Sequence, residues 1–342
     1  MAIQTVLGEI PAEKLGVTLA HEHILIDLRP IVAEPTERKE VFYQKLTMAN
    51  RYLVYNDPYT LLDNALIDSE EIAIKEMKLF KAAGGVSVVD VTLDEIARDP
   101  LALQRISSAS GVNLVMGCGH YTNASLPEAV HRASVNELAK GMIDDLTVGV
   151  RDTGVKAGVI GEIGTSAKIT DTERKVLAAA GIAAAETGKA VQVHTALYEE
   201  NGIEVIETLK RYGVSPQKIA IDHVDVKLRE DYLYKLLDMG AYVEFDNFGK
   251  EFYISARSGA ILNERFAYDL ERAQLIAKLV KRGYLKQILI TNDICLKSML
   301  CEYGGNGYGH ILKTVKDMLL DQGLSERDFK TLVENNVAEF LE

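Results

Sequence analysis

Short hydrophobic runs rich in valine and isoleucine recur along the chain, and a longer stretch with helical periodicity follows most of them. Such runs predict buried strands, and apolar positions spaced by about 3.6 residues predict helices. The predicted strands cover residues 18–27, 86–92, 113–119, 158–164, 190–195, 219–225, 242–248 and 288–294. The predicted helices cover residues 69–83, 95–109, 126–148, 171–187, 202–212, 228–239, 269–283, 309–322 and 325–341.

Strands that alternate with helices in this way indicate repeated βα units and a parallel sheet. Because no glycine-rich fingerprint follows the first predicted strand, the pattern favours a closed (β/α)8 TIM barrel over an open doubly wound sheet, which remains the alternative. We see no linker and therefore predict one domain over residues 1–342. The extra length lies at 28–68 and 249–268, directly after strands, where the substrate loops of a barrel are found.

Composition and charge narrow the classes of partner. The 342 residues are 47% hydrophobic and 26% charged, which is typical of a compact protein and excludes a disordered one. The net charge of −12 argues against nucleic acid or an anionic membrane as partner, and leaves a small-molecule substrate. The sequence shows no secretory signal or membrane-spanning run, and three cysteines fit a reducing compartment, so we expect a cytoplasmic protein. A homodimer is left open.

Polar residues interrupt several predicted strands near their carboxyl ends, where burial is costly unless each polar group is satisfied. His21 and His23 are two residues apart on one strand, so their side chains point to the same side. His194 and His223 are about one βα unit apart, which places them on adjacent strands. Glu162 lies on the strand before them, and Asp293 lies on the last strand, beside the first in a closed barrel.

Four imidazoles and two carboxylates are too many ligands for one tetrahedral zinc ion. They suit two divalent ions that share a carboxylate and a hydroxide. The absence of thiolates favours Zn²⁺ and leaves Mn²⁺, Fe²⁺, Co²⁺ and Ni²⁺ open. The alternative interpretation is a set of hydrogen-bonded core histidines and buried ion pairs. Four further acidic residues on these strands are expected to orient the histidines or to end strands; they are Asp222, Asp225, Glu244 and Asp246.

The chain resembles the phosphotriesterase family of the amidohydrolase superfamily, and within it the phosphotriesterase-like lactonases. The resemblance rests on short motifs that occur in order on successive predicted strands and in the tail, and HxH alone would be a weak signal. The motifs are GVTLAHEH at 16–23, GEIG at 161–164, VHT at 193–195, DHVD at 222–225, ND at 292–293, GYGHI at 307–311 and ENN at 334–336.

The resemblance implies a role for each candidate ligand. His21, His23 and Asp293 resemble the ligands of the more buried metal, and His194 and His223 resemble those of the more exposed one. Most members of the family bridge the metals with a carbamylated lysine. This chain offers a glutamate at that position, in GEIG, and no lysine falls within that predicted strand. We therefore expect Glu162 to be the bridging ligand.

This chemistry supports hydrolysis by a hydroxide that bridges the metals. Two metal charges lower the pKa of the shared water, and the more exposed metal polarises the scissile C=O or P=O bond. Asp293 is expected to accept the proton, and His223 to relay it outward. Asp293 and His223 are therefore the predicted catalytic pair.

Two features bear on the substrate. Tyr121 resembles a tyrosine that the lactonase branch places beside its metals, which favours a carbonyl substrate. The loop after the seventh strand contributes Lys250, Arg257, Arg265 and Arg272, which could hold a phosphate or carboxylate group. We predict that Tyr121, Lys250 and Arg272 bind the substrate.

The sequence therefore predicts a binuclear metal-dependent hydrolase of a lactone or carboxylic ester, with a phosphorylated sugar lactone as one option. An organophosphate triesterase or an N-acyl amidase would use the same metals and remains an alternative. A catalytically idle barrel that binds a ligand is the alternative outside enzymes. Retention of all six expected ligands argues against the idle barrel.

Overall fold

The computed structural model describes residues 2–254 and 264–342. Eight parallel strands form one sheet in which they follow each other in sequence order. The strands are β3 (Thr18–Glu22), β6 (Ser87–Asp90), β7 (Asn113–Cys118), β8 (Val159–Gly164), β9 (Val191–His194), β10 (Ile219–Ile221), β11 (Tyr242–Phe245) and β14 (Ile288–Ile290). All eight predicted strands are confirmed, each within its predicted range.

The sheet curls until its first and last strands meet. Thr291, directly after β14, donates a hydrogen bond from Oγ1 to the carbonyl oxygen of His21 on β3, at 3.0 Å. The buried carboxylate of Glu22 accepts hydrogen bonds from the backbone N–H groups of Asn292 and Ile294, at 2.9 and 2.7 Å. These bonds join both edges, so the predicted (β/α)8 barrel is confirmed and the open sheet is excluded.

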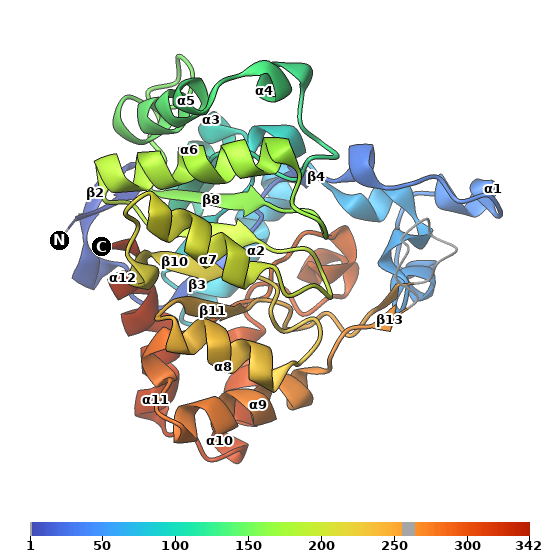
Figure 1. Ribbon diagram of the computed structural model, residues 1–342. Helices are drawn as coiled ribbons and strands as arrows, with labels where there is room; N and C mark the ends of the chain where they lie inside the picture. Colours follow the sequence, from blue (N-terminus) through green and yellow to red (C-terminus); the bar gives the residue numbers. More distant parts are fainter. Residues whose placement is uncertain (1, 255–263) are drawn as a thin grey trace.

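Helices cover the outside of this barrel (Figure 1). They are α2 (Glu70–Ala82), α3 (Pro100–Ser110), α4 (Glu128–Arg132), α5 (Val135–Thr147), α6 (Asp171–Thr187), α7 (Gly202–Arg211), α8 (Glu230–Asp238), α9 (Asp269–Lys281), α10 (Lys316–Asp321), α11 (Glu326–Lys330) and α12 (Asn336–Leu341). Among the described residues, none of these helices combines the length and apolarity that crossing a membrane requires.

One predicted helix, 126–148, is two helices in the structure. The chain breaks between α4 and α5, where Ser134 caps the second helix. Its Oγ accepts a hydrogen bond from the backbone N–H of Glu137, and its own N–H donates to the Glu137 carboxylate. This reciprocal capping box starts a new helix, and hydrophobic periodicity alone did not reveal the break.

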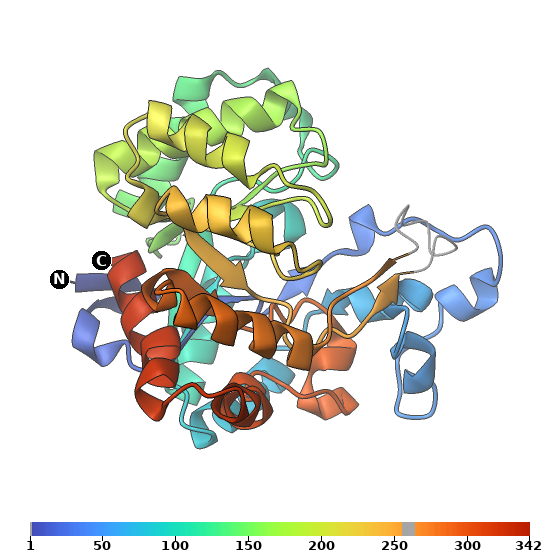
Figure 2. The same ribbon diagram turned by 60° about the horizontal axis from the view of Figure 1, so that its bottom comes forward.

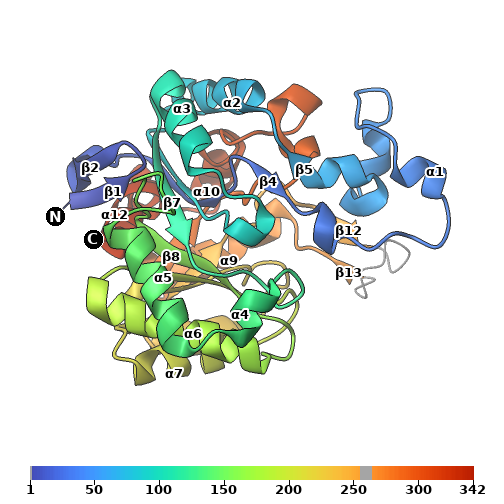
Figure 3. The same cartoon turned by 90° about the horizontal axis from the view of Figure 1, so that it is seen from above.

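The two ends of the barrel differ. At the amino ends of the strands, the hairpin β1 (Ala2–Thr5) and β2 (Gly8–Pro11) lies beside α12, near both chain termini (Figures 1 and 3). At the opposite end the described parts of the predicted loops project, over 28–68, 249–254 and 264–268 (Figure 2). The first loop carries α1 (Lys39–Phe42) and β5 (Leu66–Ile67), and β5 pairs with β4 (Ile26–Asp27) just before the loop. The second loop carries the antiparallel pair β12 (Tyr253–Ile254) and β13 (Glu264–Arg265).

Candidate active site

The carboxylate of Glu162 lies at the centre of the predicted histidines. Its Oε2 is 3.1 Å from His194 Nδ1, 3.5 Å from His21 Nε2 and 3.6 Å from His223 Nε2. Its Oε1 is 3.3 Å from His23 Nε2. Because the four imidazoles come from β3, β9 and the end of β10, the barrel gathers them around one carboxylate on β8.

Asp293 completes this group from the end of β14. Its Oδ1 lies 3.3 Å from His23 Nε2 and 3.9 Å from His21 Nε2. The structure therefore brings together all six residues that the sequence singled out as ligands. We call them the six-residue cluster: His21, His23, Glu162, His194, His223 and Asp293.

The donor atoms of this cluster fit two metal ions. They form two groups, His21 with His23 and Glu162, and Glu162 with His194 and His223, and the atoms within each group lie within 4.8 Å of one another. Nε2 of His21, which faces Glu162, is buried without a hydrogen-bond partner, which would be costly in a purely structural core. Two groups that share one carboxylate match a binuclear site with Glu162 as the bridge.

The electrostatics of the cluster keep its carboxylates ionised. Burial acts to raise the pKa of Glu162, but His21 and the other histidines outweigh it and hold that pKa well below its usual range. Burial opposes ionisation of Asp293 as well, and the neighbouring Lys250 and histidines lower its pKa. Both side chains therefore have the anionic form that divalent cations bind.

Two of the cluster residues have a left-handed backbone conformation. The φ angles are 61° at His223 and 49° at Asp293, directly after β10 and β14. Residues other than glycine pay about 1–3 kcal/mol for such strain, which persists where surrounding bonds enforce it. Here the carboxylate of Asp246 holds the N–H of His223 at 2.8 Å, and Glu22 holds the N–H groups on both sides of Asp293.

Neighbouring polar groups orient the histidines. His21 Nδ1 lies 3.4 Å from Asp222 and 3.5 Å from Glu244, and His223 Nδ1 lies 3.0 Å from Asp246, so these acids stand where the sequence placed them. The sequence analysis missed Thr92, whose Oγ1 is 2.9 Å from His23 Nδ1. A threonine after β6 carries no signal that would set it apart.

Asp225 has a different partner from the one expected. It binds Asn247 Nδ2 at 2.7 Å and lies 2.9 Å from Nε of Arg272 instead of contacting a histidine. Arg272 is fully buried and also bonds to Asp269 at 2.9 Å. It does not line the cavity above the cluster, so we do not retain the prediction that Arg272 contacts the substrate.

That cavity is small and mostly apolar, with a volume of about 90 Å³. Tyr121 lines it, and its hydroxyl lies 3.3 Å from His194 Nδ1. This tyrosine therefore lies beside the cluster, as the resemblance implied. Apolar and aromatic side chains make up much of the rest of the wall, among them Ile26, Leu28, Tyr59, Leu197, Phe252, Ile254, Phe266 and Leu296. Several come from the 28–68 segment, where the sequence predicted a substrate loop without singling out residues.

Lys250 is the basic residue that enters this cavity among the described residues. It is only 3% exposed, and its ammonium group contacts Asp293. Arg265 lies on the surface in a paired contact with Glu271. Arg257 lies outside the described residues.

Comparisons with known proteins agree with this geometry. The family model described as "Phosphotriesterase family" matches residues 1–341. The chain belongs to the phosphotriesterase family. An N-acetyltaurine hydrolase from Dictyostelium discoideum is 30% identical over 98% of this chain and 96% of its own length. A phosphotriesterase-related protein from Nematostella vectensis is 35% identical over 94% of this chain and 93% of its own length.

Two solved structures share the barrel. A resiniferatoxin-binding protein from Rhodobacter sphaeroides is 33% identical, with a TM-score of 0.96 over 100% of this chain and 95% of its own. A phosphotriesterase homology protein from Escherichia coli, complexed with phosphate in its active site, is 30% identical, with a TM-score of 0.79 over 96% of this chain and 99% of its own. This phosphotriesterase-family chain is therefore a metal-dependent hydrolase that acts on a small-molecule substrate.

Proposed function

We propose that the protein hydrolyses a small carboxylic amide that carries an acidic group, such as an N-acylated amino acid or aminosulfonate. The observation that carries this proposal is Lys250, a buried cation in a small apolar cavity beside the six-residue cluster. Its ammonium group contacts Asp293, and a metal ion on Asp293 would compete for that carboxylate and leave Lys250 able to pair with an anionic substrate group. The relatives named N-acetyltaurine hydrolase, which are 30–34% identical, support an amide with a sulfonate.

In this proposal the cluster holds two divalent ions. His21, His23 and Asp293 would bind one, His194 and His223 the other, and Glu162 both. Zn²⁺ suits these ligands, and Mn²⁺, Fe²⁺, Co²⁺ and Ni²⁺ are the alternatives. When bound, the ions supply a water of lowered pKa and polarise the scissile carbonyl.

The remaining steps belong to side chains. Asp293 accepts the proton of the attacking water on a carboxylate oxygen, and His223 is the proposed relay for that proton. The buried Asp246, 3.0 Å from His223 Nδ1, orients the ring. Burial raises the pKa of Tyr121, so its phenol stays protonated and can donate a hydrogen bond to the substrate carbonyl. Lys250 holds the acidic end of the substrate.

A lactone or carboxylic ester is the second candidate, and the position of Tyr121 beside His194 favours it. The same attack on a carbonyl would open a lactone, and a phosphorylated lactone would also satisfy Lys250. An organophosphate triester fits less well, because it has no anionic group for Lys250, which lines this cavity.

The test is a hydrolysis comparison on the metal-loaded protein. N-acetyltaurine, its uncharged analogue N-ethylacetamide, a γ-lactone and a paraoxon-like triester are assayed at matched concentrations. We expect the highest kcat/KM for N-acetyltaurine or another acidic amide. Faster hydrolysis of the triester than of every carbonyl compound would contradict the proposal.

A further inference from the structure

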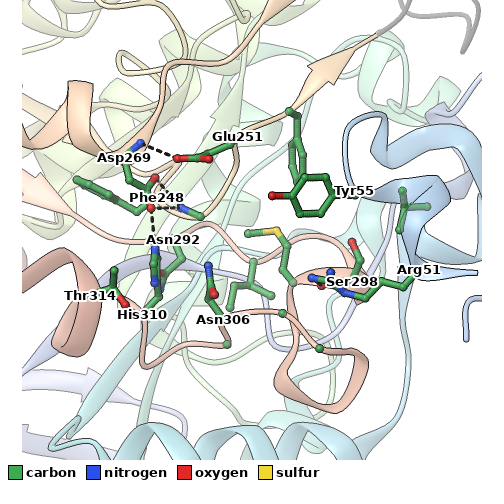
Figure 4. Close-up of a pocket in the computed structure, with 18 of the residues that line it drawn as sticks. Arg51, Tyr55, Phe248, Glu251, Asp269, Asn292, Ser298, Asn306, His310 and Thr314 are labelled. Carbon is green, nitrogen blue, oxygen red and sulfur yellow. Dashed lines mark hydrogen bonds and ion pairs between the residues drawn. The ribbon is translucent and has the colours of Figure 1, made fainter. Parts of the chain in front are cut away.

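A second cavity has a volume of about 430 Å³, and Figure 4 shows the residues that line it. It adjoins the first at Phe252, which among the described residues is the one that lines both cavities. Successive residues of the chain face different cavities at this point. Lys250 lines the first cavity, whereas its neighbours Gly249 and Glu251 line the second. Asn292 likewise faces the second cavity although its neighbour Asp293 belongs to the cluster. The second cavity is therefore a separate compartment.

Opposite charges stand on opposite sides of this cavity. Arg51 and Tyr55 lie on one side, and Glu251 and Asp269 lie on the other (Figure 4). Arg51 donates a long hydrogen bond of 3.5 Å to the carbonyl oxygen of Ser298, and its Nε is buried without a partner. Among the described residues, no carboxylate lies within salt-bridge distance of Arg51. Its charge is therefore available to a ligand.

On the acidic side of the cavity, one of the two carboxylates is available to bind a ligand. Asp269 is already satisfied, because His310 lies 2.6 Å from one of its oxygens and Arg272 lies 2.9 Å from the other. Glu251 is exposed, and among the described residues it accepts one hydrogen bond, of 3.3 Å, from the backbone N–H of Asp269. Its carboxylate therefore retains most of its capacity to accept hydrogen bonds.

Asn292 adds an unsatisfied acceptor. It is 1% exposed, and its Nδ2 donates to Glu22 Oε1 at 2.9 Å, which fixes the orientation of the amide. Its Oδ1 has no hydrogen-bond partner. Buried acceptors are nearly always paired, so an unpaired oxygen in a residue that lines this cavity is unusual.

We propose that the second cavity binds a small zwitterion, an amino acid or aminosulfonate. The acid group binds Arg51, and the ammonium group binds Glu251 on the opposite wall. A cavity with one cation and one anion on opposite walls selects such a molecule over a simple acid or a simple amine, since each of those leaves one wall unpaired. This site is separate from the cluster and goes beyond the hydrolytic function.

Binding of taurine to the metal-loaded full-length protein, measured by calorimetry, tests the proposal. Ethanesulfonate, which lacks the amine, is the matched probe. We expect Arg51→Gln to weaken taurine binding at least about tenfold and ethanesulfonate binding similarly, since both lose a charge-assisted bond. Glu251→Gln should weaken taurine binding several-fold and leave ethanesulfonate binding unchanged.

Two exposed residues provide controls, because Arg132→Gln and Glu128→Gln change the same charges far from the cavity. Lys250→Met reports on binding in the cavity above the cluster. We expect the two surface variants to bind taurine like the unaltered protein. Lys250→Met should lose only taurine bound above the cluster and should keep the binding that depends on Arg51 and Glu251. The proposal is overturned if the unaltered protein binds no taurine, if Glu251→Gln and Arg51→Gln both bind it normally, or if Lys250→Met abolishes binding.

Discussion

At the scale of single residues, Glu162 is the centre of the proposed metal site. Its two oxygens face His23 on one side and His21, His194 and His223 on the other. This position was predictable, because GEIG falls on the strand next to the histidine-bearing strands. The bridging role follows from the geometry and remains a proposal.

Glu162→Gln should remove the bridge, since an amide is neutral and binds divalent cations weakly. We expect metal content to fall from two equivalents to one or none, and hydrolysis to fall at least about a hundredfold. Elemental analysis after gel filtration measures the first effect. Glu200→Gln, at an exposed glutamate, is the control, and two retained equivalents in Glu162→Gln would contradict the bridging role.

Lys250→Met preserves much of the side-chain volume and removes the charge. If Lys250 binds the acidic end of the substrate, the preference for N-acetyltaurine over N-ethylacetamide should fall at least about tenfold, which corresponds to one charge-assisted hydrogen bond. The ratio of the two kcat/KM values is the measurement. Lys227→Met on the surface should leave this ratio unchanged, and an unchanged ratio in Lys250→Met would show that Lys250 does not select the substrate.

The sequence predicted ligands better than substrate contacts. The spacing of His21 and His23 on a strand, and the repeat distance to His194 and His223, fix where those side chains meet. Arg272 is an example of a contact that the sequence could not predict. Its place after the seventh strand put it near the site, but the pattern did not indicate that Asp225 and Asp269 bind it. Tyr59 lies in an irregular loop whose conformation no periodic pattern determines.

At the scale of elements, tight contact between strand ends and loops supports the site. A Cβ atom on Gly164, the last residue of β8, would come within 2.2 Å of the backbone nitrogen of Thr122 and 2.3 Å of the carbonyl carbon of Tyr121. The loop that carries Tyr121 can therefore approach only a glycine. On α5, a Cβ on Gly141 would meet nothing within 4 Å.

These two glycines form a matched pair. Gly164→Ala should destabilise the protein by about 1–3 kcal/mol through overpacking and should displace Tyr121 from His194. Gly141→Ala should stabilise it by about 0.5–1 kcal/mol, as alanine does in a helix interior. Urea denaturation of both variants measures these changes. Equal stability of the two variants would mean that β8 and the Tyr121 loop are not packed as described.

A buried polar network joins α9 to the barrel. It runs from Asp246 through Asn247, Asp225 and Arg272 to Asp269, at hydrogen-bond or ion-pair distances of 2.6–2.9 Å. Burial opposes ionisation of Asp269, but His310 and Arg272 outweigh it and lower its pKa below the usual value. Because the pKa is lower in the folded state, Asp269 contributes stability above its unfolded pKa of about 3.9, and this contribution is lost as pH falls through the folded pKa.

Asp269→Asn should therefore lower the free energy of unfolding by about 3 kcal/mol at neutral pH, where it leaves Arg272 without one partner. The difference from the unaltered protein should shrink once the pH falls below about 4. Denaturation at several pH values measures it, with Asp321→Asn at the surface as control. A difference that stays constant down to acid pH would show that ionisation of Asp269 does not stabilise the fold.

At the scale of the whole molecule, the two ends of the barrel differ in their roles, because one end packs the chain termini and the other carries the candidate active site. The β1–β2 hairpin and α12 lie at one end of the barrel, and the described parts of the long loops lie at the other (Figure 2). The cluster lies at the carboxyl ends of the strands, on the side of these loops. The eight repeated βα units made the arrangement of the barrel predictable from the sequence. The two cavities could not be predicted in the same way. They depend on how residues of the 28–68 segment pack against loops more than 200 positions away, such as Arg51 against Ser298. One domain over residues 1–342 stays a prediction.

The central claim is that this barrel uses two divalent ions to hydrolyse a small acidic amide. The most direct measurement follows the release of taurine from N-acetyltaurine by protein whose metal content is measured in the same sample. The account predicts two equivalents of metal, hydrolysis that a chelator abolishes, and recovery on adding Zn²⁺ or Mn²⁺. Protein that holds two equivalents yet hydrolyses neither N-acetyltaurine nor another acidic amide would contradict it.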